Sequence, residues 1–393
     1  MAKASKTAKV LIGATAFGAS FFDPDIRWRT QFSAPDPFVV VVHSGKTVLF
    51  VSELEYERAK KQARADEVLL IEKLREEFGL PKMAPASAWL PLYLKREGID
   101  TLEVSPFYDT VLKLSKDFDM SIPKGPLFPE RAVKTRDEIG NIKKVRDATE
   151  EVLDMVFRAI RGMDIYEGKI FDPKGVIGKK DDFLTAEVLR SFMNREFISR
   201  DCFCPDTIIA SGNQAVDPHC IGFGPLCANV PIVFDVFPRS TDNLYWYDTT
   251  RTVVKGILRP EALALYDMVK AGQSLGLTMI KEGANGKDIH LAIDGMFVSA
   301  GYKTGLQKAL VDGKEVMMMQ GFFHGTGHGV GVDIHESPRI SWVDDTLREN
   351  MVVTCEPGLY YWGIGGVRIE DTVVVTKNGY NNLSRYTREL LEL

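Results

Sequence analysis

Short apolar runs alternate with amphipathic stretches between residues 38 and 120. The runs FVVVVH, TVLFVS, EVLLI and TLEVS are rich in β-branched residues, which is typical of strands. Between them, residues 53–65, 71–79 and 87–98 carry apolar positions at helical spacing. This alternation of strands and helices predicts a small α/β domain in the first part of the chain.

The pattern changes after residues 123–129, which hold three prolines and a glycine and therefore predict a linker. Thr135 and Glu138 then have the spacing of a capping box, and apolar residues recur at helical spacing from Ile139 to Ile160. Further helices are expected near residues 183–197, 260–282 and 286–300, and strands near 206–211, 231–237, 244–255, 351–356 and 366–376. The second domain is predicted to be α+β with antiparallel sheet.

The length of 393 residues suits two domains, which we place at 1–128 and 129–393. A hydrophobic content of 45 % and a charged content of 26 % are close to the globular average. The net charge is −5 and no long Lys/Arg cluster is present, so nucleic acid is not an expected partner. Five cysteines scattered over a long chain fit a reducing compartment, and we expect a cytoplasmic protein.

The N-terminal residues loosely imitate a signal peptide, because Lys3, Lys6 and Lys9 precede the mostly apolar run Val10–Phe22. Glycines and threonine interrupt this run, and it leads directly into strand-like sequence, so a first β-strand is the preferred interpretation. No segment approaches the ~20 apolar residues that a membrane span needs, so a membrane is not an expected partner.

Two segments of the second domain look alike: IVFDVF leading to DTTRTVV, and VVTCEP leading to IEDTVVV. The first pair carries Asp235 and Asp248, 13 residues apart, and the second carries Glu356 and Glu370, 14 residues apart. Paired strands would bring both carboxylates of each pair together, and a pseudo-twofold axis would bring the two pairs together. The likeness is weak evidence of duplication, since two β-rich acidic segments can arise by chance.

The segment from His324 to Pro338, HGTGHGVGVDIHESP, contains three of the six histidines of the chain. Four glycines lie between these histidines, and glycine lets the backbone approach a ligand closely. Four carboxylates brought together without cations would raise one another's pKa, whereas two divalent cations would cancel their charge. An oxygen-rich set with one imidazole suits Mn²⁺ or Co²⁺, with Zn²⁺ also compatible. We therefore expect a dinuclear-metal hydrolase whose ligands are Asp235, Asp248, His328, Glu356 and Glu370.

A competing zinc site would combine Cys202 and Cys204 with His219, Cys220 and Cys227. Thiolates and imidazole do bind zinc, but a CxC followed by HC fits no common structural zinc pattern. These cysteines are interpreted as ordinary buried or strand residues.

The motifs resemble those of the pita-bread metallopeptidases, the family of methionine aminopeptidase, aminopeptidase P, prolidase and creatinase. SGNQAVDPHC around His219, Asp235 with DTTRT, HGTGHGVGVDIHESP and EPGLYYWGIGGVRIED follow one another in the order of that family. The resemblance covers both domains. It implies a C-terminal pita-bread domain with a pseudo-twofold, preceded by a smaller α/β creatinase-type domain.

The resemblance also implies a role for each motif residue: Asp235 as a ligand of one metal, His328 and Glu356 as ligands of the other, Asp248 and Glu370 as bridges, His219, His324 and His335 as contacts of substrate and tetrahedral intermediate, and Arg368 and Tyr360 as residues that orient the carboxylates. Glu356 is either the general base or a simple ligand, and either His324 or His335 stabilises the oxyanion. The chain departs from many relatives at Phe237-Pro238, where they have a glycine and a shorter connection. The resemblance therefore says less about this hairpin tip and the substrate pocket beside it.

The N-terminal domain separates the chain from methionine aminopeptidases, and the resemblance implies small Xaa-Pro peptides as substrates, cleaved by metal-activated hydroxide. Because proline lacks an amide N–H and has a fixed φ, such bonds need a dedicated pocket. A dipeptidase is preferred because the chain is short, with aminopeptidase P as the alternative. A catalytically silent pita-bread binding protein is the alternative from another class, and the intact ligand set argues against it. The resemblance to this family also implies a homodimer.

Overall fold

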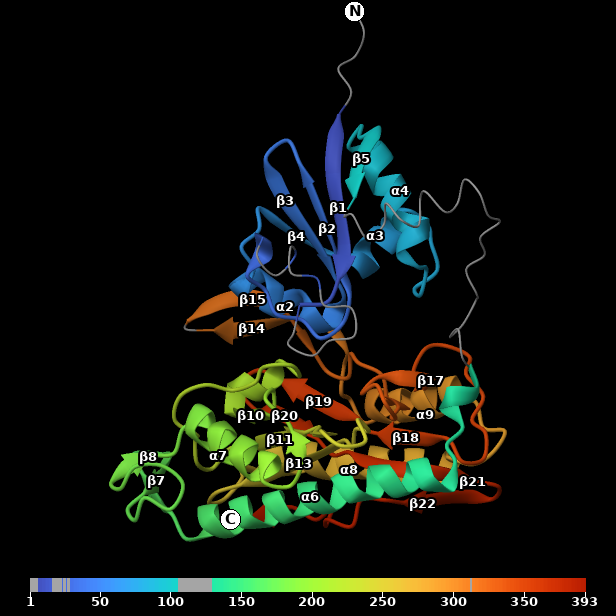
Figure 1. Cartoon of the computed structure of the whole chain (residues 1–393). Coiled ribbons are helices and arrows are strands. Elements are labelled where there is room, and N and C mark those ends of the chain that lie inside the picture. The colour runs from blue at the N-terminus through green and yellow to red at the C-terminus, as the bar shows by residue number, and fades with distance from the viewer. Residues whose placement is uncertain (1–5, 16–22, 24–25, 27–28, 105–128, 312) are drawn as a thin grey trace, which may run out of the picture. The chain divides into compact units, whose positions relative to one another are not determined.

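The computed structural model describes residues 6–15, 23, 26, 29–104, 129–311 and 313–393 (Figure 1). The chain divides into two compact units, Met1–Gly125 and Pro126–Leu393. The predicted linker lies outside the described residues except for Pro129, so the domain boundary at residues 128 and 129 stays a prediction. No helix within the described ranges is both long and apolar enough to span a membrane.

The N-terminal unit is built on a mixed five-stranded sheet of order β4-β3-β2-β1-β5. Its strands are β1 (Thr7–Gly13), β2 (Phe38–His43), β3 (Lys46–Val51), β4 (Glu67–Leu70) and β5 (Thr101–Val104), and its helices are α2 (Glu53–Gln62), α3 (Ile71–Glu77) and α4 (Ala86–Arg96). Side chains alternate across β2, because Val39 and Val41 join the cluster with α3 and α4, whereas Phe38 and Val40 join the opposite cluster. The predicted small α/β domain is confirmed.

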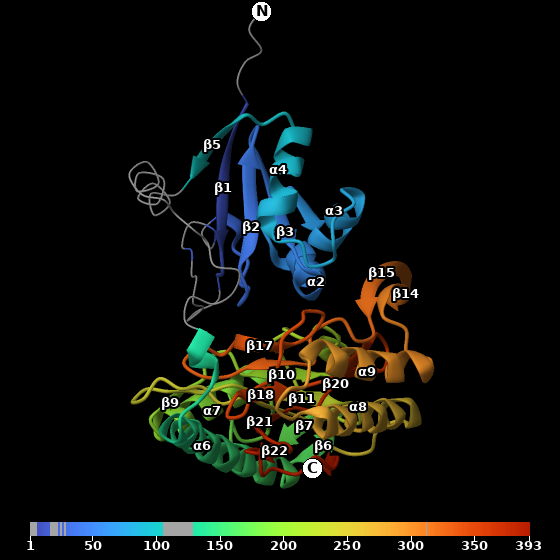
Figure 2. The ribbon, with the colours of Figure 1, turned by 90° about the vertical axis from the view of Figure 1, so that its right-hand side faces the viewer.

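The C-terminal unit begins with the 3₁₀ turn η1 (Pro129–Ala132) and the helix α6 (Arg136–Arg161). Thr135 and Glu138 form the predicted capping box, and the apolar stripe of α6 is buried. Its other helices are α7 (Ala186–Ile198), α8 (Pro260–Met279) and α9 (Gly286–Ser299). Figure 2 shows α6 and α7 on one side of the strands and α8 and α9 on the other, and two separate apolar cores fill these layers.

Two antiparallel hairpins form the centre of this unit. β11 (Ile232–Val236) pairs with β13 (Thr249–Val254), and β18 (Val352–Cys355) pairs with β21 (Asp371–Thr376). The first hairpin lies in a sheet with β10 (Ile208–Ser211) and β23 (Leu391–Glu392), and the second in a sheet with β16 (Gly327–Gly329), β17 (Glu336–Ile340) and β22 (Gly379–Asn382). The two look-alike segments of the sequence are therefore two real hairpins.

The predicted single strand at 366–376 is wrong, because it is two strands in different sheets. β20 (Gly365–Arg368) pairs with β19 (Gly358–Tyr361), whereas β21 pairs with β18. The strands separate at Glu370, whose N–H donates to the carbonyl of Thr250 in the other hairpin. This crossing is a tertiary interaction that an apolar run cannot reveal.

The predicted strand at 244–255 starts later, at Thr249, because the preceding residues form a turn. Ser240 N–H donates to the carbonyl of Tyr245, and its hydroxyl accepts from the N–H groups of Asp242 and Asn243. The remaining elements are β6 (Asp164–Tyr166), β7 (Lys169–Asp172), β8 (Asp182–Phe183), β9 (Cys202–Phe203), β12 (Arg239–Ser240), β14 (Gly305–Val311), β15 (Lys314–Gln320) and the 3₁₀ turn η2 (Gly212–Val216). None of these was predicted, and neither were β16, β17, β19, β22 and β23.

Candidate metal centre

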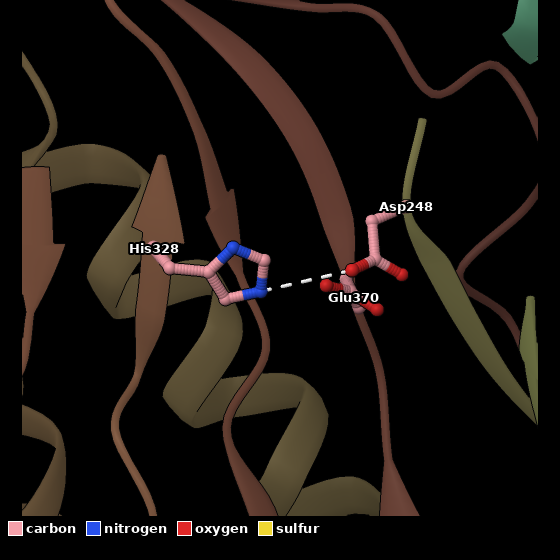
Figure 3. Close-up of side chains that lie close together, drawn as sticks. All are labelled: Asp248, His328 and Glu370. Atoms are coloured by element: carbon pink, nitrogen blue, oxygen red, sulfur yellow. Dashed lines mark ion pairs between the residues drawn. The ribbon is translucent and has the colours of Figure 1, made fainter. Parts of the chain in front are cut away.

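Three of the predicted ligands converge between the two hairpins. One potential donor atom each of Asp248, His328 and Glu370 lies within 4.8 Å of the others, and all three residues are buried (Figure 3). Asp248 directly precedes β13, Glu370 directly precedes β21, and His328 is the central residue of β16. Each hairpin thus supplies one carboxylate at the start of its second strand, and the glycine-rich strand β16 supplies the imidazole.

The other two predicted ligands lie at the edges of this group. Glu356 follows β18, and its Oε1 is 3.1 Å from His328 Nε2. Asp235 lies in β11, and its Oδ2 accepts a hydrogen bond of 2.6 Å from Arg368 Nη2. Charge from Asp235 and Glu356 acts on both Asp248 and Glu370. The structure therefore brings the five residues to one place, and their role as ligands stays a prediction.

The donor set fits divalent cations. Burial, followed by the negative charge of neighbouring carboxylates, raises the pKa of both Asp248 and Glu370 well above its ordinary value. Within the described part of the chain, Asp248 Oδ1 and Glu370 Oε1 are buried and have no hydrogen-bond partner. An unsatisfied buried acceptor costs about 1–3 kcal/mol, and more when it is charged. Cations held by these oxygens would remove both the repulsion and this cost.

Glu356 differs from the two raised carboxylates. Burial favours its neutral form, but the hydrogen bond from His328 and the positive charge of Arg368 outweigh burial and hold the pKa of Glu356 below its ordinary value. The hydroxyl of Thr354 also donates to Glu356 Oε1, at 3.3 Å. Glu356 is thus kept as a charged acceptor, which fits both a ligand and a group that receives a proton.

Arg368 connects the two sides of the site with one buried guanidinium. Its Nη2 donates to Asp235, its Nη1 donates to the Tyr360 hydroxyl at 2.8 Å, and its Nε donates to Thr250 Oγ1 at 3.2 Å. Thr250 in turn donates to Glu370 Oε2 at 2.8 Å. Arg368 and Tyr360 therefore lie where residues that orient carboxylates are expected.

His324 has both ring nitrogens in use within the protein. Its Nδ1 lies 2.8 Å from the carbonyl of Gly325, which can only accept, so Nδ1 carries the proton. Its Nε2 lies 2.8 Å from the hydroxyl of Tyr360. In the neutral ring Nε2 carries no proton, so the hydroxyl donates to it. Burial lowers the pKa of His324 to about 4, so the imidazole is neutral near pH 7.

The two other predicted histidines border the same site. The ring of His335 packs edge-on against that of His328, with 4.3 Å between centroids. His219 is fixed by its N–H, which donates to Asp217 Oδ1 at 3.0 Å, and it is close enough to His324 to act on its charge.

The competing zinc interpretation finds no support. Cys202 and Cys204 are buried, and burial raises the pKa of their thiols to about 11 and about 12. No candidate metal group among the described residues includes a cysteine. Both thiols stay protonated near neutral pH, and thiolate is the form that binds metal.

Sequence reasoning missed Thr250 and Thr354. Each is two positions from a predicted ligand, Asp248 and Glu356 respectively, and residues two apart along an extended chain face the same side. That alternation was the signal that could have found them.

Buried carboxylates arranged for divalent cations, between two hairpins that are enclosed by helices, define a metal-dependent hydrolase of the α+β pita-bread fold. Residues 140–377 match the profile of metallopeptidase family M24, so the chain belongs to this family and is a metal-dependent peptidase.

The similarity to proteins of known sequence or structure covers nearly the whole chain. A Xaa-Pro dipeptidase of Pyrococcus furiosus is 30 % identical over 372 residues, which cover 92 % of this chain and 91 % of that protein. Among solved structures, an X-Pro aminopeptidase from Thermotoga maritima superposes with a TM-score of 0.55 at 20 % identity, covering 99 % of this chain and 98 % of that one. A prolidase from Pyrococcus horikoshii superposes with a TM-score of 0.54 at 24 % identity, covering 98 % and 95 %. Both solved structures have the same fold as this chain.

Proposed function

We propose that this protein is a dinuclear-metal dipeptidase that hydrolyses the bond before proline in Xaa-Pro dipeptides. The observation that carries the proposal is the convergence of Asp248, His328 and Glu370 with unpartnered buried carboxylate oxygens. The Xaa-Pro specificity is supported by the 30 % identity to a Xaa-Pro dipeptidase along nearly the full length of both chains.

Asp235 is assigned to one cation, His328 and Glu356 to the other, and Asp248 and Glu370 to both. An oxygen-rich set with one imidazole favours Mn²⁺ or Co²⁺, with Zn²⁺ as a further candidate. Such cations, when bound, lower the pKa of water and polarise a carbonyl. Glu356 is the proton acceptor in this scheme because its neighbours keep it ionised.

His335 is the group that we assign to the developing oxyanion. His324 has its Nδ1 proton committed to Gly325 and its Nε2 committed to Tyr360, so it has no proton left to offer a substrate. His324, Tyr360 and Arg368 instead form a relay that fixes Asp235. His219 is assigned to substrate contact.

The proposal is tested by removing metal with chelator, restoring Mn²⁺, Co²⁺ or Zn²⁺, and offering Ala-Pro, Ala-Ala and Ala-Pro-Gly. We expect cleavage of Ala-Pro alone. Release of Ala from the tripeptide would instead indicate an aminopeptidase P. Absence of metal-dependent turnover on all three would contradict a peptidase and favour a catalytically silent binding protein.

The dinuclear arrangement is tested by the variant Asp248→Ala. Loss of a bridging carboxylate is expected to abolish dinuclear occupancy, as measured by metal analysis after dialysis. Glu282→Ala, at a carboxylate outside the site, serves as the control and should bind as much metal as the wild type. A stoichiometry of two metals in Asp248→Ala would refute the bridging assignment.

We also infer that the protein is a homodimer and acts in the cytoplasm. Family habit supports the first inference, and the five free cysteines support a reducing compartment. Light scattering on the purified full chain tests the oligomeric state.

A further inference from the structure

A buried ion pair outside the ligand set joins the start of the C-terminal unit to the histidine-rich segment. Lys134 Nζ is bonded to Glu336 Oε1, and the two side chains are 1 % and 5 % exposed. Arg131 adds a second cation, with its Nη2 3.0 Å from Glu336 Oε2 and 2.5 Å from Asp333 Oδ2. Because taking a charged pair out of water costs about as much as the pair regains, stability alone is a weak reason for its presence.

The Lys134 ammonium has all three of its protons in use. Besides Glu336, it donates to the carbonyls of Arg131 at 3.0 Å and Ala132 at 3.1 Å. The backbone of the same segment is fixed to the second sheet, because Lys134 N–H donates to the carbonyl of Asn350 and Val133 forms a bridge with Met351. The Lys134 ammonium is thus held in one position, and it holds the Glu336 carboxylate there.

Glu336 lies at the end of the loop between β16 and β17, residues 330–335, which carries His335. It is the first residue of β17 and lies opposite Gly329, where the register shifts next to His328. Its carboxylate folds back under the loop so closely that a Cβ on Gly331 would lie 2.5 Å from Oε1. The adjacent residue is His335, whose ring packs on His328.

The opposite side of the loop is held by the hairpin between the two aspartates. Trp246 N–H donates to the carbonyl of Gly331 at 2.8 Å, and its indole Nε1 donates to the carbonyl of Val332 at 3.1 Å. These bonds hold the middle of the loop, and the buried ion pair of Glu336 with Lys134 holds its end, next to His335.

We propose that Lys134 and Arg131 are positioning residues, which hold Glu336 and thereby keep the His335 ring against His328 and facing the substrate. The inference rests on the proposed function, because it takes His335 as the group that contacts the reacting peptide. It predicts that loss of the ion pair lowers kcat on Ala-Pro through His335 and leaves the metal content unchanged.

A double-mutant cycle tests this coupling in the full-length, metal-loaded protein. Lys134→Met removes the charge and keeps most of the side-chain volume, and is expected to lower kcat/KM on Ala-Pro by about tenfold to a hundredfold, since small misplacements of reacting groups cost that much. In a His335→Ala background, the same substitution is expected to cost less than about twofold, because residues that act as a unit do not give additive losses. Fully additive losses, or unchanged kcat/KM in Lys134→Met, would overturn the proposal.

Two further variants keep the test decisive. If Lys134→Met does not fold, Glu336→Gln enters the same cycle, because it removes the charge and retains the shape. Arg58→Met is the matched control, since Arg58 and Glu55 form a buried pair in the N-terminal unit, 9 % and 3 % exposed. It should lower the melting temperature without changing kcat, and an equal loss of kcat in this control would show a general effect of instability and overturn the proposal.

The outcome also separates this inference from the proposed function. A wild-type protein that cleaves no Xaa-Pro peptide with any metal refutes both. An active wild type with additive losses in the cycle refutes the positioning role alone.

Discussion

Keeping Asp248 and Glu370 ionised in the structure costs free energy, which bound protons or cations would remove. Both are buried beside other carboxylates, and each leaves one oxygen without a hydrogen bond within the described residues. Protons offset part of the repulsion in the metal-free protein, and cations replace them. Metal binding at this site is therefore expected to release protons and to become weaker as the pH falls.

Stability should show this exchange as a function of pH. Because the folded-state pKa values of Asp248 and Glu370 are raised, their contribution in the metal-free protein is complete below the ordinary values of 3.8 and 4.5 and is lost as pH rises through the raised values. Stabilisation by Mn²⁺ should accordingly increase from pH 5 to pH 8. The measurement is the melting temperature with chelator and with saturating Mn²⁺. An increment that does not change with pH would contradict this account.

Arg368 is the residue whose geometry a lysine cannot reproduce. Its three nitrogens donate to Asp235, Tyr360 and Thr250 in different directions, whereas an ammonium is a point charge. Arg368→Lys is expected to weaken Mn²⁺ binding or activity by about 10–100-fold, as measured by titration of activity with metal. Arg195→Lys on the exposed face of α7 is the control and should match the wild type, and an unaffected Arg368→Lys would show that its charge alone suffices.

At the level of elements, two helices approach each other closely through glycines. A Cβ on Gly272 of α8 would lie 2.6 Å from Phe297 Cζ of α9, and a Cβ on Gly276 would lie 2.8 Å from Ile293 Cδ1. The same Cβ on Gly276 would lie 3.0 Å from the Sγ of Cys355, the residue before Glu356. Close packing of α8 therefore supports the strand that ends at a predicted ligand.

Matched glycine substitutions test this packing. Gly272→Ala should destabilise the protein by about 1–3 kcal/mol, because overpacking forces the Phe297 ring to move. Gly295→Ala on α9 has open space around it and should instead stabilise by up to about 1 kcal/mol, since alanine favours a helix. Chemical denaturation of both variants measures the two free energies. A stabilising Gly272→Ala would contradict the close approach of the helices.

At the level of the whole molecule, the two units have separate apolar cores. Residues of the N-terminal unit fill two clusters around its sheet, and the C-terminal unit has its own cores on either side of the strands. All five predicted metal ligands lie in the C-terminal unit.

Separate cores predict two unfolding transitions, of which metal affects one. A ligand stabilises only the unit that binds it when the units unfold independently. Calorimetry of the full chain with and without Mn²⁺ should show an upward shift of one transition, and Asp248→Ala should remove that shift. A single transition, or an equal shift of both, would show that the units unfold together.

The sequence by itself determined the elements that depend on near neighbours, and the residues that gather at the site. The capping box at Thr135 and Glu138 acts over three residues, and strands β2 and β3 form from apolar runs rich in valine. The five predicted ligands could be named because their motifs follow one another in the order of the family that they resemble.

Only the tertiary structure decided which of these residues touch. The division of residues 366–376 into two strands depends on a hydrogen bond from Glu370 to Thr250, and His324 is hydrogen-bonded to Tyr360, 36 residues away. Lys134 and Glu336 are 202 residues apart, and nothing in the pattern around either one predicts a buried partner. Local sequence encodes backbone preference and burial, whereas the pairing of distant polar groups is fixed only when the packed sheets bring them within hydrogen-bond distance.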